Sequence, residues 1–224
     1  MRHTFRKSVH VVLACVTGVA APNFAGELGK LAEFEDPAAF EVRGRTLTID
    51  KGVASLDAHE GDGIAWLRGA SFEDGRVSLE VRGSGLAGRS FVGIAFHASP
   101  DKSRYDVVYV RPFNFQAPDP LRRAHSLQYM AVPDHDWQRL RQQFPGKYEA
   151  AITPSPAPEE WVPMTIEVLD GKARVFVGGQ SSASLSVDLL NEGGGDALGL
   201  WVGNNSDGKF RNLRIAPARP ERVN

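Results

Sequence analysis

Apolar and polar side chains alternate over short runs of the chain, most clearly between Phe91 and Arg111. Two alternating runs flank a polar turn that contains proline, which predicts a β-hairpin because successive strand side chains point to opposite faces. One face of the first strand is bulky, whereas the other carries Gly93, Ala95 and His97. Gly93 and Ala95 are small, which indicates space on that face for a ligand or for another part of the chain.

The second strand of this hairpin continues the alternation. Tyr109 and Arg111 share one phase, and Val108 and Val110 share the other. Strand parity therefore predicts that Tyr109 and Arg111 lie on the open face of the hairpin, near His97.

Similar short runs continue from Phe40 onward, and no long helical periodicity is present. The pattern predicts twelve strands, near residues 46–50, 53–56, 63–68, 76–82, 90–98, 105–111, 126–132, 162–169, 172–177, 184–188, 197–203 and 209–215. Evenly spaced antiparallel strands favour an all-β fold, a two-sheet antiparallel jelly-roll sandwich, over a parallel α/β fold.

Turn signals and long loops separate the predicted strands. Asp-Gly pairs at 74–75, 170–171 and 207–208 favour hairpin turns, because both residues tolerate positive φ. Residues 111–125 and 133–163 form longer interruptions, and long loops of a compact sandwich are more often functional than accidental. Residues 136–144 have helical spacing and predict one or two helical turns.

Composition is typical of a soluble globular protein, with 42% hydrophobic and 24% charged residues. A chain of 224 residues fits one large all-β domain, which we place at residues 40–216. The net charge is −1 and no basic stripe is interleaved with aromatic residues, so nothing indicates a nucleic-acid partner.

The first 21 residues resemble an export signal. Arg2, Arg6 and Lys7 precede an apolar segment that is too short for an ordinary membrane span. We therefore expect a secreted or periplasmic protein, with a linker or weakly ordered segment at 22–39 and a flexible tail at 217–224. The single cysteine, Cys15, lies within this segment, in a context that resembles a lipoprotein cleavage box, so a lipid anchor is the alternative.

Several segments together resemble the concanavalin A-like lectin and glucanase superfamily, over about residues 40 to 215. They include FEDGRVSLEVR, SFVGIAFHA, YDVVYVRPFN, HDWQRLR and WVPMTIEVLDGKARVFV, and the closing LGLWVGNNSDGKFRNLRI is the most specific. Within the superfamily the chain resembles laminin-G-like jelly rolls and, most closely, the 3-keto-disaccharide hydrolase-like domains. The resemblance implies two curved sheets and a saccharide or glycoside ligand on the concave face.

Strand parity then gives the residues that we expect on this face. They are Glu80, Arg82, His97, Tyr109, Arg111, Gln128 and Trp201, flanked by Asn114, Asn204 and Asn205 from loops. An aromatic ring can stack on a pyranose, while Arg, Gln and Asn donate hydrogen bonds to hydroxyl groups. The set therefore predicts a sugar-binding face.

Structural roles for the same residues remain open at this point. Trp201 could pack under the loop 133–163, and Arg111 could form a buried pair with Glu80, because buried arginines are generally paired. His97 could be a structural imidazole. The space beside Gly93 could admit the loop 112–125.

The sequence does not establish catalysis. Retaining glucanases need two carboxylates about 5 Å apart, and the strand around Glu80 offers only one. The resemblance to 3-keto-disaccharide hydrolases leaves another route, in which His97 or Glu80 acts as a base and Arg111 stabilises an enolate. The alternative is a non-catalytic adhesion or protein-binding module of the laminin-G-like type.

We expect no cofactor, although two polar clusters could supply oxygen ligands to Ca²⁺. One cluster contains Asp134, His135 and Asp136, and the other contains Asn204, Asn205 and Asp207. Polar turns have the same composition. No feature of the sequence indicates an oligomeric state.

Overall fold

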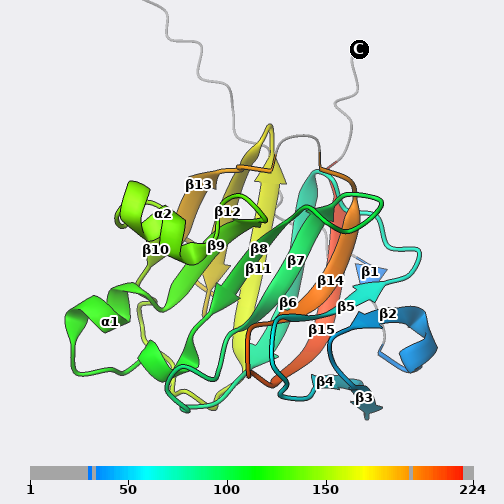
Figure 1. The fold of residues 1–224 in the computed structure, drawn as a ribbon, viewed down its shortest axis with the longest axis horizontal. Coiled ribbons are helices and arrows are strands. Elements are labelled where there is room, and N and C mark those ends of the chain that lie inside the picture. The colour runs from blue at the N-terminus through cyan, green and yellow to red at the C-terminus, as the bar shows by residue number, and fades with distance from the viewer. Residues whose placement is uncertain (1–29, 32–33, 192–193, 219–224) are drawn as a thin grey trace, which may run out of the picture.

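The computed structural model describes residues 30–31, 34–191 and 194–218, and its strands form two antiparallel sheets (Figure 1). Sheet A has the order β13-β12-β11-β6-β15-β4-β3, with β1 beside β15. Its strands are β1 (Lys30–Leu31), β3 (Leu47–Asp50), β4 (Val53–Leu56), β6 (Gly75–Arg82), β11 (Val162–Leu169), β12 (Lys172–Val177), β13 (Leu185–Asp188) and β15 (Gly208–Pro217).

Sheet B has the order β10-β9-β8-β7-β14-β5-β2. Its strands are β2 (Phe40–Arg43), β5 (Gly63–Leu67), β7 (Val92–Ala98), β8 (Tyr105–Val110), β9 (Leu127–Val132), β10 (Glu149–Ala150) and β14 (Ala197–Val202). This architecture confirms the predicted all-β, two-sheet antiparallel jelly-roll sandwich.

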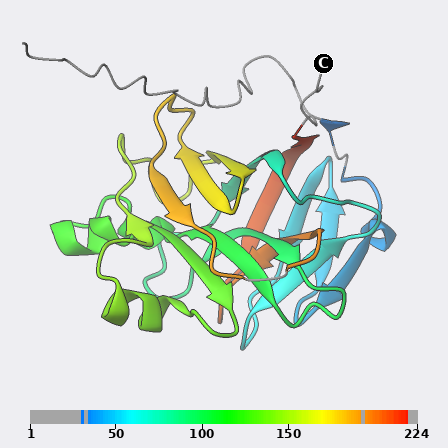
Figure 2. The same ribbon diagram turned by 90° about the horizontal axis from the view of Figure 1, so that it is seen from above.

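Short helices lie in the loops. Two are 3-10 helices, η1 (Pro37–Ala39) and η2 (Pro112–Asn114), and two are α-helices, α1 (Pro120–Ala124) and α2 (Trp137–Gln143). Figures 1 and 2, two perpendicular views, place α1 and α2 at the same end of the sandwich, beside β9 and β10. The long loops therefore build up this end of sheet B.

The core lies between the sheets and follows the predicted parity. Val77, Leu79 and Val81 of β6 are buried, whereas the residues between them are only half-buried. A side chain added at Gly208 of sheet A would meet Val202 and Val92 of sheet B, so these two valines face inward. Residues of the opposite phase in sheet B therefore lie on the face turned away from sheet A, which we call the outer face of sheet B.

All twelve predicted strands are present, within two residues at each end. The structure adds β1, β2 and β10, which are too short or too irregular to show alternation. The predicted helical turns at 136–144 are confirmed by α2, whose first turn is capped by the Asp136 carboxylate. Helix α1 was not predicted, although Asp119 and Pro120 are a typical helix start.

Only one Asp-Gly pair forms a hairpin turn. Asp170 and Gly171 both have positive φ and join the paired strands β11 and β12. The hairpin prediction is wrong for 74–75 and 207–208, because β5 and β6, like β14 and β15, belong to different sheets. A turn dipeptide marks a change of direction, but it does not fix the partner of the next strand.

Two elements of the structure lie before residue 40, where the domain was predicted to begin. Strand β1 and helix η1 fall within residues 22–39, where a linker was predicted, and Phe34 is buried against the core. Residues 1–21 and Cys15 lie outside the described residues. In the part of the chain that the structure describes, no helix is long and apolar enough to cross a membrane.

Candidate functional site on the outer face of sheet B

The hairpin of β7 and β8 places Tyr109 on the outer face of sheet B. In its register Gly93 lies opposite Tyr109. A Cβ added at Gly93 would come within 2.5 Å of the Tyr109 Cα and closer still to the Val108 carbonyl oxygen. The space predicted beside Gly93 is therefore filled by another part of the chain, the neighbouring strand, and not by the loop 112–125.

Trp201 lies on the same face but does not offer its ring to solvent. It is only 2% exposed, and its ring lies 4.9 Å from that of Tyr109. A Cβ at Gly203 would approach the Trp201 ring to 3.0 Å, so this glycine leaves room for the indole. Trp201 thus packs beside Tyr109, across Gly93, and does not form an exposed stacking surface.

Arg111 follows β8 and is held by neutral oxygen atoms. Its Nη1 donates to the His125 carbonyl at 2.9 Å and to Gln128 Oε1 at 3.2 Å, and its Nη2 donates to the Tyr109 hydroxyl at 2.7 Å. The residue is 4% exposed, and burial lowers its pKa. Since arginine keeps its proton in proteins, a charged guanidinium lies here without a carboxylate in contact among the described residues.

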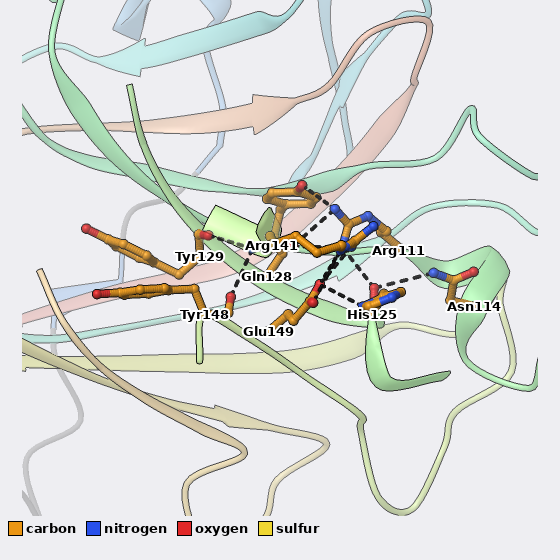
Figure 3. Close-up of polar contacts among 9 residues, drawn as sticks. Arg111, Asn114, His125, Gln128, Tyr129, Arg141, Tyr148 and Glu149 are labelled. Carbon is orange, nitrogen blue, oxygen red and sulfur yellow. Dashed lines mark hydrogen bonds and ion pairs between the residues drawn. The ribbon is translucent and has the colours of Figure 1, made fainter. Parts of the chain in front are cut away.

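Tyr109 and Gln128 orient this guanidinium. Burial raises the pKa of Tyr109 to about 12, so its hydroxyl keeps its proton at neutral pH. Gln128 Nε2 donates to the carbonyl oxygens of Tyr129 and Tyr148, at 2.9 and 3.0 Å, and this fixes its Oε1 toward Arg111 (Figure 3). Strand β10 contributes to the arrangement because Gln128 pairs with Glu149 in the sheet.

Glu149 is the one carboxylate of this group. It accepts from Arg141 Nη2 at 2.7 Å and from Arg141 Nε at 3.1 Å. The Nδ1 of His125 lies 2.7 Å from Glu149 Oε2, as an ion-pair contact without the alignment of a hydrogen bond (Figure 3). Burial lowers the pKa of His125, and Arg141 and Arg111 lower it further against the opposing effect of Glu149.

Trp137 is the exposed part of the site. It is 41% exposed, and its ring lies 5.0 Å from the Arg141 guanidinium carbon and 5.8 Å from that of Arg111. The first residue of α2 thus presents an aromatic ring close to two cationic groups. Its helix is anchored by Leu140, which is fully buried.

Asn114 and Arg122 complete the site toward α1. Asn114 Nδ2 donates to the His125 carbonyl at 3.4 Å, and its Oδ1 accepts from Arg122 Nε at 3.3 Å. We call the group of Tyr109, Arg111, Asn114, Arg122, His125, Gln128, Trp137, Arg141 and Glu149 the outer-face site. Four of the predicted site residues, Tyr109, Arg111, Asn114 and Gln128, belong to it, and Trp201 supports it.

The predicted position of His97 is wrong. In the hairpin register His97 lies at the opposite end of β7 from Gly93 and Tyr109, so it is not near Arg111. Its φ of 53° is in the left-handed region and takes its side chain out of the alternation. The imidazole Nδ1 lies 3.2 Å from the fully buried Asp106 carboxylate, and Nε2 lies 2.5 Å from the Glu73 carbonyl oxygen.

The predicted grouping of Glu80 and Arg82 with the other residues is also wrong. Both lie on β6 of sheet A, facing away from sheet B. Glu80 forms an ion pair with Arg211, whose guanidinium carbon lies 4.3 Å from the Trp161 ring. The alternative that Arg111 forms a buried pair with Glu80 is therefore wrong, because parity along a strand does not tell which sheet the strand joins.

Three of the remaining polar candidates have side-chain partners within the protein. Asn204 Oδ1 accepts from the Gly61 amide at 2.8 Å, and Asp134 pairs with Arg104 at 2.7 Å. Asp136 caps α2. Over residues 34–191 and 194–218, no three His, Cys, Asp or Glu side chains are placed so that they could hold a metal ion.

The residues of the site that sequence reasoning missed are Arg122, His125, Trp137, Arg141 and Glu149. The length of the loop 133–163 was one signal, and the shared helical spacing of Trp137 and Arg141 was another. No local signal connects Glu149 with His125, because loop packing brings these residues together.

Comparison with known proteins supports the fold. No protein-family model and no curated protein sequence matches the chain. Among solved structures, a carbohydrate-binding module CBM66 from Bacillus subtilis has a TM-score of 0.55 at 12% identity, covering 78% of this chain and 93% of that one. The exoplasmic domain of VIP36, in a form bound to Ca²⁺ and Man3GlcNAc, has a TM-score of 0.57 at 10% identity, covering 87% and 92%.

A third similar structure is the carbohydrate recognition domain of Emp47p, with a TM-score of 0.52 at 13% identity over 86% of this chain and 95% of that domain. These likenesses show that the chain has the concanavalin A-like lectin fold. They do not extend to the narrower resemblance to 3-keto-disaccharide hydrolases.

Proposed function

We propose that this domain binds a saccharide at the outer-face site. The site combines one exposed aromatic ring with several guanidinium groups, a combination that can hold a sugar ring by stacking and by hydrogen bonds to its hydroxyl groups. Tyr109, Gln128 and Trp201 are buried beneath it, so the donors are held by packed side chains.

The observation that carries this proposal is the position of Trp137. An indole that is 41% exposed lies 5.8 Å and 5.0 Å from the guanidinium carbons of Arg111 and Arg141, next to a buried polar network. The exposed part of this ring offers a surface on which a sugar can stack, close to guanidinium groups that can donate hydrogen bonds to its hydroxyl groups. The similar structures support the proposal, because several are described as carbohydrate-binding modules or carbohydrate recognition domains.

The test compares two aromatic residues of nearly equal exposure. Phe144 follows α2, is 42% exposed and packs near Tyr148 and Lys147. We expect Trp137→Ala to weaken saccharide binding by about tenfold or more, a loss of about 1.4 kcal/mol. Phe144→Ala keeps the affinity. Thermal-shift screening of an oligosaccharide panel identifies the ligand, and titration calorimetry then measures both variants.

Absence of binding to the whole panel, or equal losses in the two variants, contradicts the proposal. A merely structural role of Trp137 would lower the melting temperature without changing the affinity of the folded protein. Melting curves without ligand therefore accompany each titration.

A second candidate function, glycoside processing, rests on His125. Its lowered pKa keeps the imidazole neutral near pH 7, and it lies beside Arg111 and the Glu149 carboxylate. In a 3-keto glycoside such a base can take the proton from C2. The electrons of that C–H bond then form the C1–C2 double bond while the C1–O bond breaks, and the departing alcohol takes up a proton. Arg111 and Arg141 are placed to stabilise the negative charge that develops on the ketone oxygen.

A single substitution separates the two functions. His125→Gln keeps the side chain polar and removes the base, so we expect unchanged binding and loss of product release from 3-keto glycosides. Product release that persists in this variant contradicts a catalytic role for His125 and leaves saccharide binding as the function. His97→Gln is the matched control, because His97 lies outside the outer-face site.

Export belongs to the same proposal. It is supported by the sequence of residues 1–21, which has the charge and apolar length of a signal peptide. A saccharide-binding domain outside the cytoplasm meets polymers that do not enter cells. Fractionation of cells that express the full chain tests this location.

A further inference from the structure

In the described part of the chain, most arginine side chains around the outer-face site have no carboxylate in contact to neutralise their charge. Residues 111–141 contain five arginines, and among the described residues only Arg141 contacts a carboxylate. The guanidinium groups of the other four donate to neutral oxygens. Arg111 donates to the His125 carbonyl, the Gln128 side chain and the Tyr109 hydroxyl, and Arg122 donates to the Asn114 side chain. Arg123 donates to the backbone carbonyls of Ala117 and Pro118, and Arg139 donates to the backbone carbonyl of Asp134.

The acidic residues of the same region have other roles. Asp119 and Asp136 cap the helices α1 and α2. Asp134 pairs with Arg104. Among the described acidic residues of this region, Glu149 is therefore the one whose carboxylate contacts the site, through both Arg141 and His125.

Burial makes this excess significant. Arg111 is 4% exposed, and a buried charge without a countercharge is costly in a protein. Neutral acceptors satisfy its hydrogen bonds but do not neutralise its charge. An anionic group bound between Arg111, Arg122 and Arg141 would supply the missing negative charge.

We infer, on the basis of the proposed function, that the saccharide bound at the outer-face site is anionic, bearing a carboxylate or a sulfate ester. Guanidinium groups recognise both through paired N–H donors. The exposed Trp137 ring then contacts the sugar, and the nearby Arg111 and Arg141 favour a sugar that carries a negative charge.

The experiment uses matched ligands. Oligosaccharides of uronic acids, the same oligosaccharides with their carboxyl groups reduced to alcohols, and sulfated and unsulfated pairs are titrated into the full protein at low and at high salt. We expect an acidic member to bind about tenfold or more tightly than its neutral counterpart, and the preference to shrink as salt screens the charges. The uronate and sulfate arms show which anion is preferred.

Two arginine variants locate the effect. Arg122→Gln removes a guanidinium at the edge of the site and is expected to weaken binding of the acidic ligand about tenfold, with little effect on the neutral one. Arg174→Gln removes a half-exposed guanidinium on β12 of sheet A and is expected to change neither.

The outcomes separate the two proposals. Equal binding of acidic and neutral members, or preference for the neutral one, overturns the charge inference and leaves saccharide binding in place. Lack of binding by every saccharide overturns the proposed function and the inference with it. Equal losses in Arg122→Gln and Arg174→Gln also overturn the inference, because they indicate only a general electrostatic attraction.

Discussion

Two polar networks of this protein contain a histidine close to a carboxylate, and they differ in nearly every other respect. His97 lies against the fully buried Asp106, at one end of β7 and β8. His125 lies against Glu149 at the opposite end of sheet B, beside an exposed tryptophan and three arginines. The first network is closed by the protein itself, whereas the second is open and cation-rich.

The partners of each network explain the difference. Asp106 also accepts from the Tyr129 hydroxyl at 2.6 Å, and this hydroxyl accepts from the Leu190 amide at 2.7 Å. The His97 network therefore ties β7, β8 and β9 to the segment that leads toward β14. A histidine near an acid is thus no evidence for catalysis by itself, and the surroundings decide between a structural clamp and a binding site.

The largest expected effect comes from opening the closed network. Asp106→Ala leaves His97 and the Tyr129 hydroxyl without their buried acceptor, and we expect a loss of about 3–5 kcal/mol in the free energy of unfolding. Urea denaturation measures the loss. The control is Asp188→Ala, whose ion pairs with lysines lie at the surface and should matter little. A small effect at Asp106 would show that the His97 network does not hold the strands together.

A smaller effect is expected from displacing the support of the open site. Gly93→Ala places a methyl group against the backbone of Val108 and Tyr109, so we expect a loss of about 1–3 kcal/mol in stability. The methyl group also forces Tyr109 to shift, and Arg111 shifts with it. We therefore expect the folded Gly93→Ala protein to bind its ligand less tightly.

The control for this substitution is Gly85→Ala. A Cβ at Gly85 would meet only the Pro158 ring, at 3.5 Å, so stability and affinity should stay close to those of the unchanged protein. Unchanged ligand affinity in Gly93→Ala would show that the position of Tyr109 does not matter for ligand binding.

The sequence predicts the fold well because alternation is a local property. Val77, Leu79 and Val81 are buried as their phase requires, and each predicted strand exists. Sheet membership is not local. Glu80 was grouped with Arg111 by phase alone, although β6 and β8 belong to different sheets.

The candidate site could be predicted only in part, for two physical reasons. A single left-handed residue, His97, leaves the alternation without any signal in the residue pattern. Glu149 reaches His125 through the packing of α2 and β10 against β9, which depends on long loops. Tyr109 and Gln128 were found because they lie on paired strands, where parity and register fix their positions, and Arg111 directly follows one of these strands.

The last and smallest expected effect compares the two histidines directly by pH. Burial disfavours the charged form of His97, but the Asp106 carboxylate and the Glu73 carbonyl outweigh it and raise its pKa, with Asp74 adding to the increase. Its contribution to stability is therefore fully present below the ordinary histidine pKa and is lost as pH rises through the raised value in the folded protein. The pKa of His125 is lowered, so its contribution is present above the ordinary value and is lost as pH falls through the lowered one.

The two substitutions should therefore have opposite pH dependence. We expect His97→Gln to cost more stability at pH near 5.5 than near 8.5, and His125→Gln to cost more near 8.5 than near 5.5. Urea unfolding of both variants and the unchanged protein across this range measures the difference. The same direction in both variants would mean that the networks are electrostatically alike, and the contrast between a closed clamp and an open, cation-rich site would fail.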